Sequence, residues 1–217
     1  MEKIDRVLMQ RNLVYKGKVI LKYKIEYPQI KEKNKFNQYN YEKANDLRKE
    51  AEGELFEMAK KQFDYAESQG YPFNNYEIVS QFTLTYNYQN YISLYIDEYI
   101  YQGGAHGNTL RTSQTWNIVD EKMIKLSQWF RNPNYVSELI DNINQQIEQN
   151  IKKGNNIYFE DYCCLTSKNF RVENYYLKNG LIYIFYQQYD IAPYSSGILN
   201  FEIPRKSWPM PIGHFLK

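Results

Sequence analysis

A histidine beside three glycines is the first feature of the sequence that could do chemistry. Residues 99–108 read Tyr-Ile-Tyr-Gln-Gly-Gly-Ala-His-Gly-Asn, which places His106 next to Gly103, Gly104 and Gly107. Glycine reaches backbone angles that other residues avoid, and it lets a ligand or a second chain segment come close. His106 could therefore contact a ligand, act as a general base or bond to the local backbone, and the local bond is the simplest hypothesis.

The glycines themselves carry a prediction. We expect this turn to use positive φ or close backbone contact, neither of which a β-branched residue tolerates. Gly104→Val should then harm folding more than His106→Ala, which removes about one hydrogen bond.

A second segment offers two hydroxyl nucleophiles. Residues 189–197 read Tyr-Asp-Ile-Ala-Pro-Tyr-Ser-Ser-Gly, and they predict a bend between Pro193 and Gly197 with Tyr194 packed across it. Ser195 or Ser196 could act with His106 in a hydrolase, but the spacing does not fit Gly-x-Ser-x-Gly. Because such a site is recognised by geometry, the sequence alone assigns no catalytic residue.

Metal and cofactor chemistry has little support in the sequence. Zinc needs three or four protein ligands, whereas the chain has two histidines and two adjacent cysteines, Cys163 and Cys164, without HExxH or CxxC spacing. There is also no phosphate-binding loop and no dinucleotide fingerprint. We therefore expect no metal and no cofactor.

Charge and hydropathy exclude further classes of protein. Lys and Arg number 27 and Asp and Glu number 25, so the net charge of +2 argues against nucleic acid as a partner. No stretch approaches the roughly 18 apolar residues of a membrane span. The N-terminus lacks the apolar core of a signal peptide, which indicates a cytoplasmic protein if Met1 is the native start. The 23 tyrosines suit an exposed binding face, but the chain is also rich in Asn, Lys and Ile, which favours the codon bias of an AT-rich genome as the main cause.

The elements that must position these turns follow from periodicity. Apolar residues at spacings of three and four predict helices over 39–69 and 133–153. The apolar face of the first is expected to hold Ala44, Leu47, Ala51, Leu55, Met58, Ala59 and Phe63. Alternation predicts a strand within 12–30, which follows a turn at 15–18 and ends at Pro28, then three strands over 76–118. Late strands are expected at 181–186, after a hairpin turn at Asn179 and Gly180, and at 198–203. The order strand, helix, strands, helix, strands indicates an α+β fold with mostly antiparallel sheet and no strand-helix-strand unit with parallel pairing. We expect two halves, 1–118 and 119–217, packed as one globular unit.

The two motifs together resemble the paired DUF4163 and DUF3298 families. These families show aromatic-x-aromatic-x-Gly-Gly-Ala-His-Gly, then Tyr-acidic-Ile-Ala-Pro-Tyr-small-small-Gly-Ile, then a strand that ends apolar-acidic-Ile-Pro. Here the matching segments are 99–107, 189–198 and 201–204. The resemblance covers roughly residues 17–205, so residues 1–118 look like the DUF4163 half and 119–217 like the DUF3298 half.

The resemblance implies a role outside the bacterial membrane. Similar domains occur in a lysozyme-sensing anti-sigma factor and ahead of the catalytic domain of a peptidoglycan deacetylase. It therefore implies a non-catalytic recognition or sensing domain at the cell envelope, which binds a lysozyme-like protein or a wall glycan. Alternatives are a hydrolase of cell-wall material and a structural or assembly module. The candidate ligand-binding residues are Tyr101, Gly103, Gly104, His106, Tyr189, Tyr194 and Ser195.

Overall fold

The computed structural model describes residues 1–204, which form two compact units. The N-terminal unit holds Glu2–Thr83 and Ile96–Leu110, and the C-terminal unit holds Leu84–Tyr95 and the chain from Arg111 onward. Three long strands therefore contribute residues to both units: β3 (Tyr76–Tyr88), β4 (Tyr91–Tyr101) and β5 (Asn108–Asn117).

The N-terminal unit begins with a long hairpin. Strands β1 (Ile4–Tyr15) and β2 (Lys18–Ile30) pair antiparallel, and Tyr15 lies opposite Lys18. The two turn residues both have positive φ, 47° at Lys16 and 77° at Gly17. Such a two-residue turn matches the twist of the flanking strands. The sequence predicted this turn, but it missed the start of β1 and expected β2 to end at Pro28.

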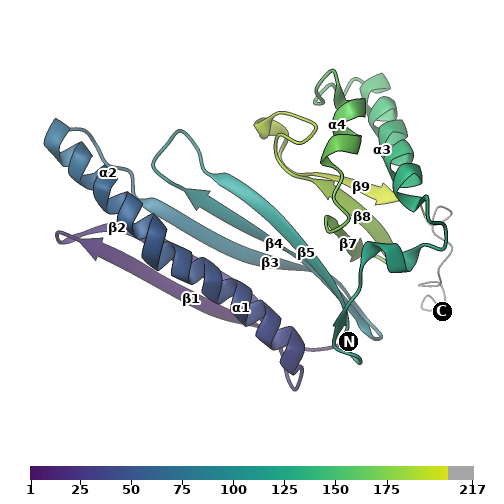
Figure 1. The fold of residues 1–217 in the computed structure, drawn as a ribbon, viewed down its shortest axis with the longest axis horizontal. Coiled ribbons are helices and arrows are strands. Elements are labelled where there is room, and N and C mark those ends of the chain that lie inside the picture. Colours follow the sequence, from purple (N-terminus) through teal and green to yellow (C-terminus); the bar gives the residue numbers. More distant parts are fainter. Residues whose placement is uncertain (205–217) are drawn as a thin grey trace. The chain divides into compact units, whose positions relative to one another are not determined.

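One long helical segment covers a face of this sheet (Figure 1). It consists of α1 (Asn34–Glu50), a π-helical turn η1 (Ala51–Leu55) and α2 (Phe56–Gln69). Its buried side chains recur every three or four residues, as predicted, and include Ala44, Leu47, Ala51, Leu55, Ala59 and Phe63. Met58, predicted for the same face, is 41% exposed instead.

Strand β3 follows the helix and corrects one expectation. It pairs parallel with β2, with Leu21 opposite Tyr76 and Ile25 opposite Ser80. The helix is therefore the crossover of a strand-helix-strand unit, which the sequence analysis did not expect. The sheet order is β1-β2-β3-β4-β5-β6, where β6 is the short strand Lys122–Met123. The α+β class with mostly antiparallel pairing is confirmed.

The C-terminal unit packs helices on a second, three-stranded sheet (Figure 1). Its strands β7 (Tyr175–Lys178), β8 (Leu181–Tyr186) and β9 (Leu199–Ile203) are antiparallel neighbours. Asn179 and Gly180 have positive φ and form the predicted hairpin turn. The helical elements of this unit are η2 (Leu126–Trp129), α3 (Tyr135–Lys152), α4 (Tyr162–Asn169) and η3 (Tyr194–Ser196).

Each unit has its own apolar core. In the C-terminal unit, Leu139, Ile143 and Ile147 of α3 pack with residues of the small sheet such as Ile184. In the N-terminal unit the helical segment packs with residues of β2 such as Ile25. Among the described residues, no helix is both long and apolar enough to cross a membrane.

Candidate functional site

The glycine turn joins β4 to β5 and is tied down by short polar contacts. The hydroxyl of Tyr101 donates to the carbonyl of Gly104 at 2.9 Å. The side-chain amide of Asn74 donates to the carbonyl of Gly103 at 3.3 Å. Gly103 has φ +82°, a left-handed value that favours glycine. The end of the turn is thus fixed by its neighbours within the N-terminal unit.

The three glycines differ in what they require. A Cβ at Gly107 would overlap the ring of Tyr99, so this residue allows a close approach of ring to backbone. Gly104 has no positive φ, and a Cβ there would meet nothing within 4 Å. The expectation of a steric need is therefore right for Gly103 and Gly107 and wrong for Gly104.

His106 lies exposed in this turn. Its Nδ1 is 2.9 Å from the carbonyl oxygen of Gly107, so the tautomer protonated on Nδ1 donates a hydrogen bond to the local backbone. This is the contact that the simplest hypothesis predicts. A contact of His106 with a ligand stays a prediction.

The loop of residues 187–198, which joins β8 to β9 and is called the Tyr189 loop below, contains a bulky residue with a strained backbone. Tyr189 has φ +66°, an uncommon value for a side chain of this size. Its side chain is 56% exposed, and its ring centre lies 5.8 Å from that of Tyr194. Strained backbone persists only where the surroundings hold it, and it clusters at functional sites.

Buried neighbours hold this loop in place. Ile191 is fully buried, and its carbonyl accepts from the backbone of Phe159 at 3.1 Å. The carboxylate of Asp190 accepts from the backbone of Gln187 at 2.7 Å, and the amide of Asn169 donates to the carbonyl of Asp190 at 2.6 Å. Burial raises the pKa of Asp190 above its ordinary value. The loop therefore presents Tyr189 from a rigid base.

The two serines of this loop differ in exposure. Ser195 is exposed, whereas the hydroxyl of Ser196 donates to the carbonyl of Ile157 at 3.4 Å. Both serines belong to the C-terminal unit, and His106 belongs to the N-terminal unit. Catalysis by His106 with either serine stays a prediction.

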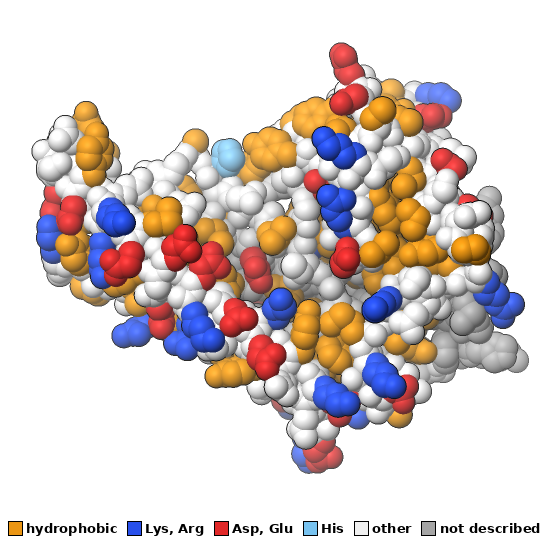
Figure 2. Space-filling view, in the orientation of Figure 1, with side chains coloured by type: hydrophobic (Ala, Val, Ile, Leu, Met, Phe, Trp, Pro, Cys, Tyr) orange, Lys and Arg blue, Asp and Glu red, His pale blue; other side chains and the backbone are white. Residues whose placement is uncertain are grey.

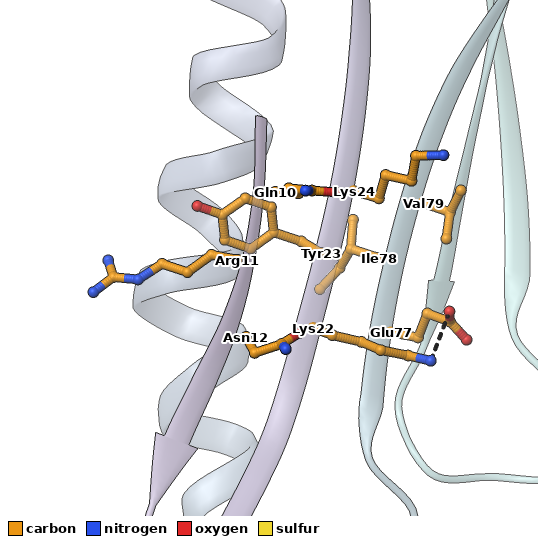
Figure 3. A pocket seen from close by; sticks show the side chains of 9 residues that line it. All are labelled: Gln10, Arg11, Asn12, Lys22, Tyr23, Lys24, Glu77, Ile78 and Val79. Carbon is orange, nitrogen blue, oxygen red and sulfur yellow. Dashed lines mark ion pairs between the residues drawn. The ribbon is translucent and has the colours of Figure 1, made fainter. Parts of the chain in front are cut away.

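A shallow hollow of about 490 Å³ lies over β1, β2 and β3 (Figure 3). Side chains alternate across these strands, so Arg11 and Tyr23 point to one side while Lys22 and Lys24 point to the other (Figure 3). Lys22 forms an ion pair with Glu77 at 3.1 Å. Because the two opposite charges neutralise each other, this hollow has no uncompensated charge from that pair to attract an ionic ligand.

A polar cluster that sequence reasoning missed surrounds the π-helical turn. Glu52 accepts from the hydroxyl of Tyr23 at 2.6 Å and from Arg48 at 2.9 Å. Burial and this hydrogen bond raise the pKa of Tyr23 to about 12, and the same bond lowers the pKa of Glu52. The only sequence signal was Gly53 inside a helix. Elsewhere on α1 and α2 both signs of charge intermix at the surface (Figure 2), as expected for a solvated helix face.

A second hollow, of about 330 Å³, lies in the C-terminal unit where β6 leads into η2. Both apolar and polar groups form its wall. Its volume lies at the lower end of the size range of ligand pockets. Its lining comes from separate segments and comprises Ser113, Gln114, Thr115, Met123, Ile124, Lys125, Leu126, Ser127, Tyr135, Val172, Glu173 and Tyr175. Sequence reasoning singled out none of these residues.

Comparison with known families finds a matching family for each of the two regions that contain the motifs. A family model described as deacetylase PdaC matches residues 15–109, and the model of DUF3298, a family of unknown function, matches residues 130–206. The chain joins a PdaC region to a DUF3298 domain. The glycine turn falls in the PdaC region and the Tyr189 loop in the DUF3298 domain, which confirms the resemblance seen in the two motifs. The division near residue 119 stays a prediction.

Solved structures agree on the fold. A DUF3298 family member from Bacteroides fragilis superposes with a TM-score of 0.69 at 18% identity, covering 94% of this chain and 91% of that chain. A DUF3298 family protein from Pseudomonas aeruginosa gives 0.64 at 15% identity, covering 95% and 92%. Comparison with curated proteins gives no match. Within residues 1–204, no cluster of three His, Cys, Asp or Glu side chains could hold a metal ion.

Proposed function

We propose that this chain is a non-catalytic recognition domain of the bacterial cell envelope, located outside the membrane. Its PdaC region and DUF3298 domain are of kinds associated with cell-wall deacetylase and envelope proteins. Its ligand is a wall glycan or a lysozyme-like protein, and the Tyr189 loop of the DUF3298 domain is the contact.

The pair of exposed Tyr189 and half-buried Tyr194 carries this proposal. A tyrosine ring covers the apolar face of a partner, while its hydroxyl reaches a polar group, so exposed tyrosines are common where proteins bind. Tyr189 is held in a left-handed conformation with its ring in solvent. The turn from Gln187 to Asp190, closed by a backbone hydrogen bond of 3.2 Å, accounts for the left-handed value at its third residue but not for an aromatic side chain there. The arrangement therefore fits a binding residue better than a packing residue.

A glycan suits this pair better than an extended protein surface. The rings lie side by side with centres 5.8 Å apart, and an interplanar angle of 37° makes a small platform rather than a broad one. The candidate residues of the glycine turn, Tyr101, Gly103, Gly104 and His106, belong to the other unit, so we propose no joint site for them.

Calorimetric titration with soluble muropeptides and, separately, with lysozyme tests the proposal. Tyr189→Ala should weaken binding at least ten-fold, which corresponds to about 1.4 kcal/mol. Tyr65→Ala is the matched control, because Tyr65 is 62% exposed on α2 and lies outside the loop. Absence of binding to both probes at high micromolar concentration would remove the proposal, and an equal loss in both variants would remove the role of Tyr189.

A further inference from the structure

Strand β5 has one edge against β4 and one outer edge. The outer edge is closed at Arg111 and at Thr115 but open at Ser113 between them. The backbone of Ile118 donates to Asn90 at 2.7 Å, and Ser93 lies beside Thr115, which fixes the register of β5 on β4. In an antiparallel pair every second residue points its backbone groups away from the partner strand. On β5 these residues include Arg111, Ser113 and Thr115, and Asn117 of the same set pairs with Lys122 of β6.

A side-chain amide closes the edge on one side of Ser113. The amide of Gln187 accepts from the backbone N–H of Arg111 at 3.0 Å and donates to its carbonyl at 2.6 Å. It therefore makes the same two bonds that a residue of a neighbouring strand would make. Asn37 bonds both backbone groups of Ile30 in the same manner, at 2.8 and 2.7 Å.

The following chain closes the edge on the other side. The backbone of Ile124 donates to the carbonyl of Thr115 at 2.7 Å. The chain then leaves the sheet, because the backbone of Lys125 bonds to the side chain of Gln128 at 2.8 Å and Leu126 enters the core. The described residues supply no strand to continue the pairing at Ser113, and the 330 Å³ hollow lies at this place.

The walls of the hollow suit one apolar side chain with backbone on either side. Met123 is 39% exposed and Val172 is 40% exposed, although both line the hollow. Lys125 and Glu173 add one charge of each sign to the lining. The hydroxyl of Ser113 is already engaged, 2.5 Å from the carbonyl of Tyr175, so the edge offers its backbone rather than its side chain.

We propose that this hollow binds a short extended peptide, which adds to β5 as a strand at Ser113. The ligand's backbone would pair with the N–H and carbonyl of Ser113, and an apolar side chain would lie against Met123 and Val172. Main-chain pairing gives such sites their affinity, and the side-chain pocket gives their specificity. A peptide is favoured over a sugar because the edge presents one donor and one acceptor at the spacing of a peptide unit. No residue of the Tyr189 loop lines the hollow, although Gln187 at the start of that loop closes the β5 edge two residues away at Arg111.

The probe is a tripeptide with valine between two threonines and both ends blocked, because a longer extended peptide would meet Gln187 opposite Arg111 and Ile124 opposite Thr115. Titration into isotope-labelled protein should move the backbone amide signals of Ser113 and Thr115 in a saturable manner and slow the hydrogen exchange of Ser113. Ser127→Trp, which places a large ring at the mouth of the hollow, should weaken binding at least ten-fold. Tyr65→Ala, an exposed position on α2 of the N-terminal unit, should leave this affinity unchanged.

The same peptide with a methyl group on the central amide nitrogen is the matched ligand control. It keeps the apolar side chain but cannot donate from that nitrogen, so strand addition predicts at least a ten-fold loss of affinity. Equal affinity for the two peptides would overturn the proposal in favour of a purely apolar pocket. A titration that does not saturate, or that moves signals elsewhere but not at Ser113, would also overturn it.

Discussion

The glycine turn and the Tyr189 loop differ in the type of residue that adopts a positive φ. Both connect strands, and both contain a left-handed residue. In the glycine turn that residue is Gly103, for which the conformation costs little. In the other loop it is Tyr189, an exposed aromatic residue for which the conformation is unfavourable.

The difference separates a steric requirement from a functional one. Gly107 is required because Tyr99 packs against its backbone, and this need is satisfied inside the fold. Nothing inside the fold requires a large ring at Tyr189, and the partly buried carboxyl of Asp190, whose pKa is raised by burial, adds a second unfavourable feature beside it. We infer that the glycine turn serves mainly the fold and the Tyr189 loop mainly recognition.

The largest expected effect is that of Gly107→Ala. The new Cβ would lie 2.4 Å from atoms at the hydroxyl end of the Tyr99 ring, so this half-buried ring must shift and lose its contact with the Gly107 backbone. Overpacking of this kind costs about 1–3 kcal/mol. Thermal and denaturant unfolding measure it, with Gly104→Ala as the control, since that position is open. If both variants unfold like the wild type, the turn is not sterically determined and the comparison fails.

Gly103→Ala should have an intermediate effect. Its φ of +82° is strained for any residue with a Cβ, at a cost of about 1 kcal/mol. Contact with the carbonyl of Asn74 and the side chain of Gln62, 3.3–3.4 Å from the new Cβ, adds to the cost. Denaturant unfolding should rank Gly107→Ala below Gly103→Ala, and Gly103→Ala below Gly104→Ala. Any other order contradicts the roles given to the three glycines.

Tyr189→Asn should leave stability nearly unchanged and weaken binding. Asparagine tolerates the left-handed region, so the variant relieves strain worth about 1 kcal/mol. It also loses the ring contact with Tyr194, which is worth about 0.5–1.5 kcal/mol. The two effects offset each other in the free energy of unfolding, whereas glycan affinity falls. A loss of more than about 2 kcal/mol of stability would make Tyr189 a structural residue.

Asp190→Asn should have the smallest effect, visible in the pH dependence of stability. Because burial raises the folded-state pKa of Asp190, the protonated form favours the folded state. This contribution is full below the unfolded pKa of about 3.9 and is lost as pH rises through the folded-state value. Melting temperatures of wild type and variant between pH 3 and 7 should therefore differ in slope, with the variant losing less stability as pH rises. Identical slopes would show that Asp190 contributes no such cost.

Much of the fold could be predicted because periodicity reports burial directly. The helix over 39–69 and the hairpin turn at Asn179 and Gly180 are examples. The parallel pairing of β2 with β3 could not be predicted, because it covers only residues 21–25 and 76–80 and leaves no turn signal. The start of β1 was missed for a similar reason, since its exposed edge does not alternate clearly.

The site was harder to predict than the fold. The glycine motif pointed to the right turn, but only the geometry shows that Gly104 is free of the constraint on Gly103 and Gly107. Because a side chain at Gly104 meets no steric obstacle, Gly104→Val is no longer expected to harm folding more than His106→Ala does. The left-handed conformation of Tyr189 has no sequence signal, because tyrosine does not favour it. The hollow beside Ser113 is built by segments far apart in the chain, so no local pattern marks it.

The interleaving of the two units has a consequence for synthesis on the ribosome. Every residue of the N-terminal unit has been made once Leu110 is added, so this unit can fold first. The hairpin tip, Leu84–Tyr95, is then already made but still lacks the rest of its unit. Apolar residues such as Ile92 and Leu94, buried in the finished protein, would wait in solvent with an open strand edge nearby. The interval before β7 to β9 emerge is thus the period when nascent chains are most prone to associate with one another.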